Sequence, residues 1–305
     1  MTDLKCSLLA LTGLVLLVTA CQKTLDITLP DNHNSQLFVE GILYVGDIPR
    51  IYLSESASFF SDKVTPQEVF VRHATVLLSE GSNTYPLQMD STFDTFRCRW
   101  VPFYTTNIIV EKDRTYQLHI EANGRTLTGE TSTALKPITI TDVEYTPEFY
   151  DVFGGHDGVI IRFQDNPGEG DYYRFQMDRW IDTSRYHAHA LDGLINTCVG
   201  EDELFFVSDL GRSIFSDFAI DGAQFELYLE VSYEYQEGDT ATIYMQTLDE
   251  HAANFYSDMD KQLESILNPF VEPAFLHSTV QGGLGVFGSA IRSPAVQFIY
   301  PQDNP

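Results

Sequence analysis

Hydrophobic and polar residues alternate over much of the chain beyond residue 36, and this period of two is typical of half-buried β-strands. The alternation is clearest at 116–120, where Tyr, Leu and Ile alternate with Gln and His, and another predicted strand follows at 126–131. Asn123 and Gly124 lie between the two runs, and both residues tolerate positive φ. The pattern therefore predicts a tight β-hairpin at this point.

Similar short strands surround this hairpin and fall into two groups. The predicted strands before it are 37–43, 51–53, 74–78 and 85–87. Short strands with turns at this spacing indicate a β-sandwich of about 100 residues, which we place at 36–136. After Lys136 and Pro137 the pattern restarts, with predicted strands at 138–143, 159–163, 172–177, 225–231 and 241–246. The stretch 180–221 is less regular and predicts a long excursion.

One segment breaks the β pattern. Its apolar residues fall on one stripe at helical spacing: Ala252, Phe255, Tyr256, Met259, Leu263, Ile266 and Leu267. Asp249 is a candidate N-cap, and Asn268-Pro269 ends the segment. We therefore expect an amphipathic helix at about 249–267 that covers a sheet. The predicted fold is mostly β, with an N-terminal β-sandwich followed at 137–305 by a second β-sandwich-like domain that carries this helix.

The N-terminus carries a different signal. An apolar run at 8–18 is too short to cross a bilayer, and it has the length of a signal-peptide core. It ends in Leu17-Val18-Thr19-Ala20-Cys21, which resembles the bacterial lipobox, although an ordinary signal peptide is the alternative. We expect residues 1–20 to be removed, Cys21 to be lipidated, and 21–35 to form a flexible tether. Two or more acyl chains would anchor the protein stably.

Charge and cysteine content narrow the functional classes. The formal net charge of −26 argues against nucleic-acid binding and against adsorption on anionic headgroups, so the lipid supplies the membrane attachment. At 43% hydrophobic residues the chain can bury a core. Once Cys6 leaves with the signal and Cys21 is lipidated, Cys98 and Cys198 remain. They could form one long-range disulfide or two separately buried thiols.

Several motifs along the chain resemble one known family. These are the lipobox, the strand Leu-Phe-Val-Glu-Gly at 37–41, the segment 165–173, the late helix, and Gly-Gly-Leu-Gly-Val-Phe-Gly at 282–288. In this order they resemble the uncharacterised lipoprotein family named domain of unknown function 4249. The resemblance implies an outer-membrane lipoprotein with an N-terminal sandwich of the regulatory, transthyretin-like kind and a second β domain. It implies no known activity.

The glycine run also matches the dinucleotide-binding spacing at Gly283, Gly285 and Gly288. That motif requires a strand that delivers the glycines to the start of a helix in a βαβ unit. Here the run follows a helix, and its surroundings are β. We therefore expect the glycines to let a strand pass close to other backbone, and we expect no cofactor.

Two weak metal candidates remain. Asp165, Asn166, Glu169 and Asp171 bring several oxygens to one short loop, as a calcium site would, although ordinary turn chemistry explains the same residues. His187 and His189 would share one face of a strand and could form half of a zinc site. The sequence supplies no third ligand for them.

These observations lead to one functional expectation and two alternatives. We expect a non-enzymatic binding or accessory module, anchored in the outer membrane on its periplasmic or extracellular side, that partners an outer-membrane β-barrel transporter. The sequence has no Gly-x-Ser-x-Gly elbow and no His-Glu-x-x-His motif. The alternatives are a surface glycan-binding or glycan-cleaving lipoprotein, for which Trp100 and Trp180 could provide stacking platforms, and a structural envelope protein.

Overall fold

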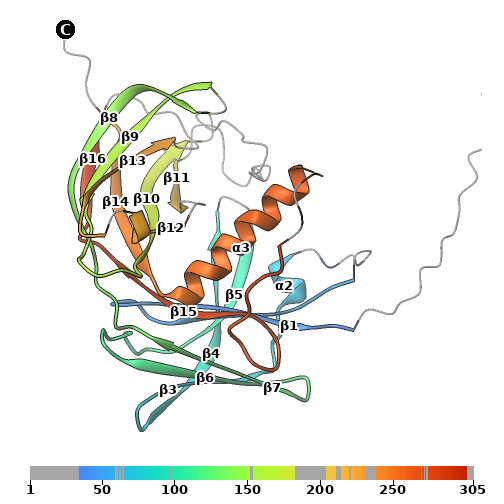
Figure 1. Cartoon of the computed structure of the whole chain (residues 1–305). Helices are drawn as coiled ribbons and strands as arrows, with labels where there is room; N and C mark the ends of the chain where they lie inside the picture. Colours follow the sequence, from blue (N-terminus) through green and yellow to red (C-terminus); the bar gives the residue numbers. More distant parts are fainter. Residues whose placement is uncertain are drawn as a thin grey trace, which may run out of the picture. The chain divides into compact units, whose positions relative to one another are not determined.

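A computed structural model describes residues 34–300 except 59–60, 62, 64, 96–97, 152–153, 183–203, 211–213, 220, 231–237, 269, 271 and 273. The residues from Ser35 onward form one compact unit. This unit is mostly β, as the sequence predicts (Figure 1).

The elements of the first half are short strands joined by turns. They are β1 (Leu37–Tyr44), β2 (Arg50–Glu55), α2 (Pro66–Val69), β3 (Thr75–Glu80), β4 (Asn83–Asp94), β5 (Arg99–Thr105), β6 (Thr115–Ala122) and β7 (Arg125–Ser132). The predicted hairpin joins β6 to β7, and Asn123 and Gly124 at its turn have φ of 51° and 71°.

The second half contains longer strands and the predicted helix. Its elements are β8 (Thr139–Asp151), β9 (Gly154–Gln164), β10 (Tyr172–Asp182), β11 (Leu204–Leu210), β12 (Phe215–Ser216), the 3₁₀ turn η2 (Asp217–Ala219), β13 (Gln224–Glu230), β14 (Thr240–Leu248), α3 (Glu250–Leu267), β15 (Leu284–Arg292) and β16 (Val296–Ile299).

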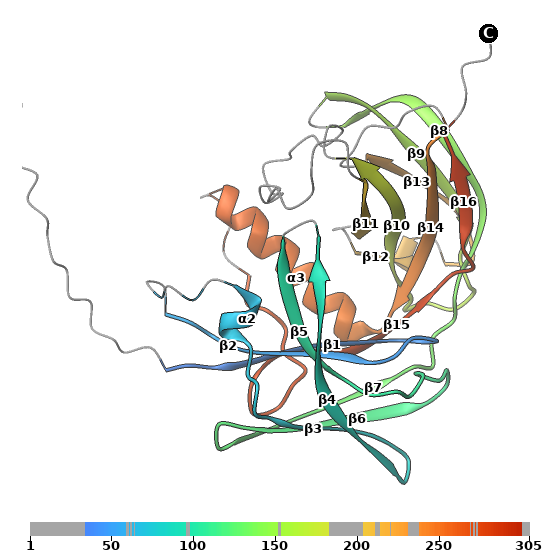
Figure 2. The ribbon, with the colours of Figure 1, turned by 180° about the vertical axis from the view of Figure 1, so that it is seen from behind.

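One large sheet joins the two halves of the chain. Its strand order is β11-β10-β14-β15-β1-β2-β5-β4-β3-β6-β7, with β12 beside β10 and β16 beside β14. A separate three-stranded sheet has the order β13-β9-β8. Figures 1 and 2 show β8 and β9 lying over β14 and β16, while β3, β6 and β7 form a layer against β1 and β15.

The strand β15 explains why the sheet is continuous. It pairs in parallel with β1, with Gly285 opposite Val39 and Gly288 opposite Ile42. Gly285 has φ of +116°, and a Cβ atom there would lie 1.8 Å from the carbonyl oxygen of Val39. At Gly288 a Cβ would lie 2.8 Å from Oδ1 of Asp249. Gly285 therefore allows β15 to approach the backbone of β1 closely, and Gly288 leaves room for the side chain of Asp249. The strand is followed by β16 instead of the helix that a dinucleotide site would require.

The first hydrophobic core fills the N-terminal sandwich. Most of its members come from β1 to β7, and they include Leu53, Leu78 and Leu118, which are all fully buried. Phe287 from β15 belongs to the same core. Its ring packs where Gly41 on the paired strand β1 and Gly129 on β7 leave room. The sandwich is thus completed by a strand from near the C-terminal end of the chain.

A second core lies between the three-stranded sheet and the β10-β14 part of the large sheet. It includes Val159, Ile161 and Phe163 of β9, together with Tyr173 and Met245. One side of each strand faces this core, because side chains alternate between the two faces of a sheet. The opposite side of β10 is left for other contacts.

Helix α3 covers part of that opposite side. Ala252, Ala253 and Phe255 pack with Ile42 and Val286 in a third apolar cluster. The backbone N–H of Ala252 donates to Oδ1 of Asp249 at 2.8 Å, which confirms the predicted N-cap. Farther along the predicted stripe Met259 is exposed. In the described part of the chain, no helix is long and apolar enough to span a membrane.

The predicted domain division requires correction. The linker around Lys136 and Pro137 exists, since β7 ends at Ser132 and β8 begins at Thr139. However, 36–136 and 137–305 do not form separate units, because β15 returns to pair with β1 and buries Phe287 in the first core. The irregular excursion predicted at 180–221 also contains β11, which pairs with β10.

Candidate functional site

Several residues singled out from the sequence lie outside the described residues. These are Cys21, His187, His189 and Cys198. Cys98 is disulfide-bonded. The pairing of Cys98 with Cys198, the lipidation of Cys21 and the histidine site therefore stay predictions.

The acidic loop between β9 and β10 is described, and the structure separates its four candidate ligands. Asp165 is 1% exposed and accepts hydrogen bonds from the hydroxyl of Tyr173 and, at 2.7 Å, from the N–H of Gly222. Asn166 instead donates to the carbonyl oxygen of Pro137 at 3.4 Å, and Glu169 is exposed. Only Asp165 of the four belongs to the carboxylate group described next.

Two aspartates distant in sequence join Asp165. Asp217 begins η2 and Asp221 follows in the next turn, and each of the three carboxylates offers an oxygen within 4.8 Å of the others. The two segments are held together by backbone donors: Gly170 N–H bonds to Asp217 Oδ1 at 3.0 Å. Similarly, Gly168 N–H bonds to Asp221 Oδ1 at 2.8 Å. We call Asp165, Asp217 and Asp221 the acidic group.

Asp171 lies at the edge of the acidic group, and the negative charges of that group affect its pKa. Burial raises the pKa of the Asp171 carboxyl, and the charges of Asp217 and Asp165 raise that pKa further. The hydrogen bond from Tyr173 and the charge of Lys136 oppose this shift. Burial, followed by the hydrogen bond to Asp165, also raises the pKa of Tyr173, so the phenol stays protonated and donates.

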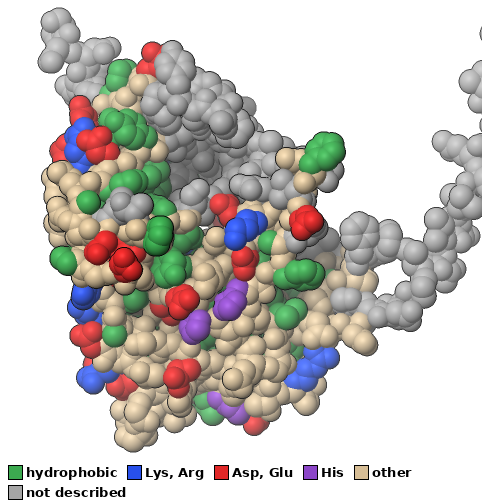
Figure 3. Space-filling view, viewed as in Figure 1, with side chains coloured by type: hydrophobic (Ala, Val, Ile, Leu, Met, Phe, Trp, Pro, Cys, Tyr) green, Lys and Arg blue, Asp and Glu red, His purple; other side chains and the backbone are tan. Residues whose placement is uncertain are grey.

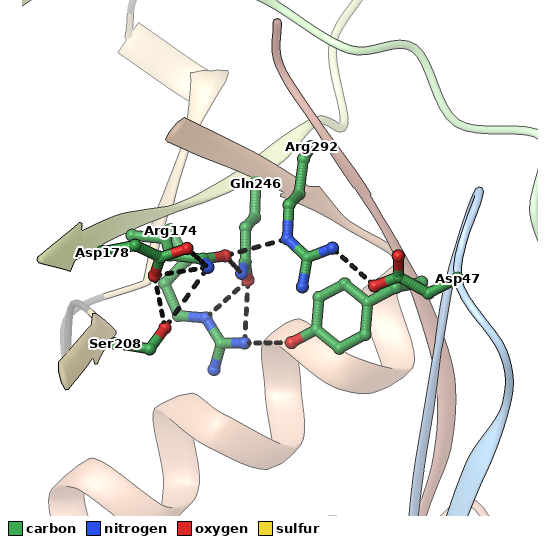
Figure 4. A network of polar contacts seen from close by, with 8 residues as sticks. Asp47, Arg174, Asp178, Ser208, Gln246 and Arg292 are labelled. Atoms are coloured by element: carbon green, nitrogen blue, oxygen red, sulfur yellow. Dashed lines mark hydrogen bonds and ion pairs between the residues drawn. The ribbon is translucent and has the colours of Figure 1, made fainter. Parts of the chain in front are cut away.

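A polar network on the other side of β10 is the second candidate site (Figure 4). Arg174 is 3% exposed, and its Nε and Nη2 donate to Oε1 of Gln246 at 3.0 and 2.8 Å. Nη2 also donates to the hydroxyl of Tyr44 at 3.0 Å, and the guanidinium lies 4.4 Å from the ring centre of Tyr256. Gln246, Tyr44 and Tyr256 are all neutral side chains. Nη1 of Arg174 has no hydrogen-bond acceptor among the described residues.

Arg292 extends this network toward β1. Its Nε donates to Oε1 of Gln176 at 3.0 Å, and Nη1 donates to Oδ2 of Asp47 at 2.6 Å. The guanidinium lies 4.4 Å from the ring centre of Tyr44. Gln246 Nε2 donates to Gln176 Oε1 at 2.6 Å and links the two arginines. We call Tyr44, Arg174, Gln176, Gln246 and Arg292 the arginine site.

The same side of β10 continues to an exposed aromatic pair. Asp178 accepts from Gln176 Nε2 at 2.9 Å and from Ser208 Oγ at 2.6 Å. Beyond it Trp180 is paired with Phe206 on β11, and their ring centres are 5.5 Å apart. Trp180 is 61% exposed and Phe206 is 46% exposed. We call the arginine site together with Asp178, Trp180, Phe206 and Ser208 the inner face.

Sequence reasoning missed most of both sites. Acidic side chains are scattered over the face of the molecule that Figure 3 shows, so their number does not identify a site. The signal for the inner face is the alternation of Arg174, Gln176, Asp178 and Trp180, where polar residues share one side of β10. Asp217 and Asp221 lie in a stretch without periodicity and gave no signal.

The comparisons with known proteins agree with the resemblance found in the sequence. No curated protein matches the chain. A family model described as a domain of unknown function (DUF4249) matches residues 22–293, which is most of the chain. The chain therefore belongs to the DUF4249 family.

Proposed function

We propose that this protein is a non-enzymatic binding or accessory module, anchored in the outer membrane through Cys21, that engages its partner through the inner face. The partner that we propose is an outer-membrane transporter. The anchor and its location rest on the lipobox-like sequence at 17–21. The observation that supports binding most strongly is the inner face itself, where a buried cation with neutral partners shares one side of β10 with an exposed aromatic pair.

The arginine site favours recognition of an anionic group. A buried guanidinium without a carboxylate partner is costly, because burial removes hydration that no opposite charge replaces. Arg174 Nη1 and Arg292 Nη2 have no acceptor among the described residues, and guanidinium groups bind carboxylates through two N–H donors. A carboxylate of a partner protein would supply those acceptors. Trp180 and Phe206 would add aromatic contact area, which often dominates binding at interfaces.

A surface glycan-binding protein is the second candidate, and one observation favours it. The indole of Trp180 is exposed beside Phe206, and the carboxylate of Asp178 lies two residues away on the same side of β10. Aromatic faces with adjacent polar groups suit the stacking of sugar rings. Glycan cleavage is a weaker form of this alternative, since it would need a pair of carboxylates placed about a substrate.

The experiment is a mild-detergent pull-down from native membranes with the full chain, an intact Cys21 and a C-terminal tag. We expect a stoichiometric integral membrane partner with the wild type. The double variant Trp180→Ala and Phe206→Ala should reduce recovery about tenfold or more, as loss of a central aromatic contact does. Tyr228→Ala is the matched control, because Tyr228 is exposed on the separate three-stranded sheet.

Recovery of the lipoprotein alone would overturn the accessory proposal. Binding of the wild type to purified surface glycans, lost in the Trp180 and Phe206 variant but retained in Tyr228→Ala, would then establish the second candidate. Equal recovery of a partner by all variants would place the interface away from the inner face.

A further inference from the structure

We propose that Asp165, Asp217 and Asp221 bind a calcium ion that ties the β9–β10 loop to the η2 turn. This inference does not depend on the proposed partner, because the acidic group shares no residue with the inner face. It rests on the geometry of three carboxylates, on one buried oxygen that lacks a hydrogen-bond partner among the described residues, and on the local balance of charge.

The geometry of the acidic group suits an oxygen-coordinated cation. The three ligand oxygens lie within 4.8 Å of one another. Calcium binds oxygen at about 2.3–2.6 Å, so two of its ligands can be up to about 5 Å apart. Magnesium binds at about 2.0–2.1 Å and requires near-octahedral order, which limits that separation to about 4.2 Å. The three oxygens are therefore within the reach of one calcium ion, and an all-carboxylate donor set favours a hard cation over zinc. Calcium is favoured over magnesium because it accepts irregular oxygen sites, whereas magnesium usually keeps several of its waters.

A second observation points to a ligand at this place. Asp217 is 1% exposed, and its Oδ1 accepts from Gly170. Its Oδ2 is buried and has no hydrogen-bond partner in the part of the chain that the structure describes. Buried polar atoms nearly always have a partner, so an orphaned carboxylate oxygen needs an explanation. Because the two oxygens of one carboxylate are close neighbours, this orphan lies beside the carboxylates of Asp165 and Asp221, and a bound cation would supply its partner.

The balance of charge around the acidic group also favours a bound cation. Asp171 adds a fourth carboxyl whose charge interacts with Asp165 and Asp217, and Lys136 is the cation that acts on Asp171. Backbone N–H groups of Gly168, Gly170 and Gly222 each bond to one of the three carboxylates. These dipoles orient the oxygens, but they do not neutralise three charges at this separation. A divalent ion offsets two of them.

The position of the ion explains what it would do. Asp165 directly follows β9, and its carboxylate receives the hydroxyl of Tyr173 from β10. Tyr173 packs in the second core against Phe163 and Phe215. Asp217 follows β12, which pairs with the beginning of β10. A cation at this site would therefore close one end of the second core by joining two connections that hydrogen bonds already bring together.

The test uses the full chain in detergent, stripped of metal with a chelator and then titrated with calcium chloride. We expect one calcium per chain by isothermal titration calorimetry. At calcium about 100-fold above Kd, the Tm should rise by about 5–10 °C, because a ligand that binds only the folded state stabilises it. Magnesium at the same concentration should raise the Tm less.

Two variants locate the site, and a third is the control. Asp217→Asn and Asp221→Asn retain an acceptor for their glycine N–H donors but remove charge, so both should fold and lose the calcium response. Glu169→Gln changes an exposed carboxylate of the same loop that lies outside the acidic group, and it should respond as the wild type does. Asp221 is exposed, so its variant tests the site even if Asp217→Asn fails to fold.

Three results would overturn the proposal. The first is a wild type whose Tm and heat of titration do not respond to calcium. The second is a calcium response that Asp221→Asn retains. The third is an Asp217→Asn protein that, measured without metal, is more stable than the calcium-loaded wild type, which would show that calcium does not compensate the charge of the acidic group.

Discussion

Two groups of three carboxylates lie on the same half of the molecule, and they differ in whether a basic side chain offsets their negative charge. On the three-stranded sheet, Arg162 lies among Asp142, Glu144 and Glu226, with nitrogen–oxygen distances of 2.6, 2.9 and 2.7 Å. At the end of the same strand β9, Asp165 meets Asp217 and Asp221, and this acidic group contains carboxylates alone. The first group includes its own cation and the second does not.

Carboxylate clusters in an acidic protein differ in the source of their counter-charge. The chain has 44 acidic and 18 basic residues, so carboxylates must often lie near one another. A cluster whose counter-charge is a side chain is a structural ion-pair network. A cluster that includes buried carboxylates and lacks a counter-charge is a candidate for binding an ion from solution, because burial makes uncompensated charge costly.

Both carboxylate groups depend on the sheets that carry them, and the greatest loss of stability should come from breaking the large sheet. In Gly285→Val the new Cβ would collide with the Val39 carbonyl in a backbone region that valine rarely adopts. We expect a loss of more than about 4 kcal/mol, or no folded protein, by urea unfolding.

Gly238→Ala is the control for this substitution. Gly238 also has positive φ, at +81°, but a Cβ atom added there would have no described atom within 4 Å. It should cost about 1–2 kcal/mol, the ordinary strain of a left-handed residue. Equal effects at the two glycines would show that backbone strain, not the contact with β1, determines the role of Gly285.

Asp249 extends the contrast to a single buried carboxylate whose two oxygens both accept hydrogen bonds. Asp249 accepts from Thr131 Oγ1 and caps α3 through Ala252 N–H. Asp249→Ala should lower the free energy of unfolding by about 1–2 kcal/mol, as loss of an N-cap does. Asp249→Asn keeps an acceptor and should cost less in thermal unfolding at pH 7.

The pH dependence of these variants has a definite sign. Burial raises the pKa of Asp249 in the folded state. The ionised carboxylate therefore opposes folding at neutral pH, and the stability of the wild type relative to Asp249→Asn should rise as pH falls through that raised pKa. A constant difference between the two proteins from pH 7 to about pH 4, near the ordinary pKa of an aspartate, would contradict this assignment.

Removing the internal cation should make the first group resemble the second. Arg162→Gln leaves Asp142, Glu144 and Glu226 facing one another on the sheet surface. We expect a modest fall in Tm at low salt that shrinks at about 1 M salt, where charges are screened within about 3 Å. A Tm equal to that of the wild type at low salt would show that the network contributes nothing measurable, as many exposed ion pairs do.

The weakest effect should be the pH dependence of that ion-pair network. Hydrogen bonds from Arg162 and then Tyr228 lower the pKa of Glu226. The stabilisation that ionised Glu226 contributes is therefore present above the pKa of Glu226 in the unfolded state, and it is lost as pH falls through the lowered pKa of Glu226 in the folded state. Glu226→Gln should flatten the acid side of the Tm profile slightly. An unchanged profile would remove Glu226 from the network.

Local features of the fold could be predicted from the sequence because they depend on neighbouring residues. The Asn123-Gly124 hairpin, the Asp249 cap and the structural role of the glycine run each follow from backbone preferences over a few positions. The parallel pairing of β1 with β15 could not be predicted, since alternation identifies a strand but not its partner. That pairing is why the two predicted domains form one unit.

The candidate sites show the same limit. The loop composition identifies Asp165, but its partners Asp217 and Asp221 come from a distant connection of the chain. Arg174 and Arg292 are separated still further, and only the sheet register brings both beside Gln246. Periodicity indicates which face of a strand a residue lies on. It does not indicate which distant strand pairs beside it.

The decisive experiment for the calcium site is to grow crystals of the protein with calcium and to measure their anomalous diffraction at long wavelength. We predict a single anomalous peak among Asp165, Asp217 and Asp221, coordinated by an oxygen of each, and no peak among Asp142, Glu144 and Glu226. No peak at the first group, or a peak at both groups, would contradict the claim that a missing counter-charge distinguishes them.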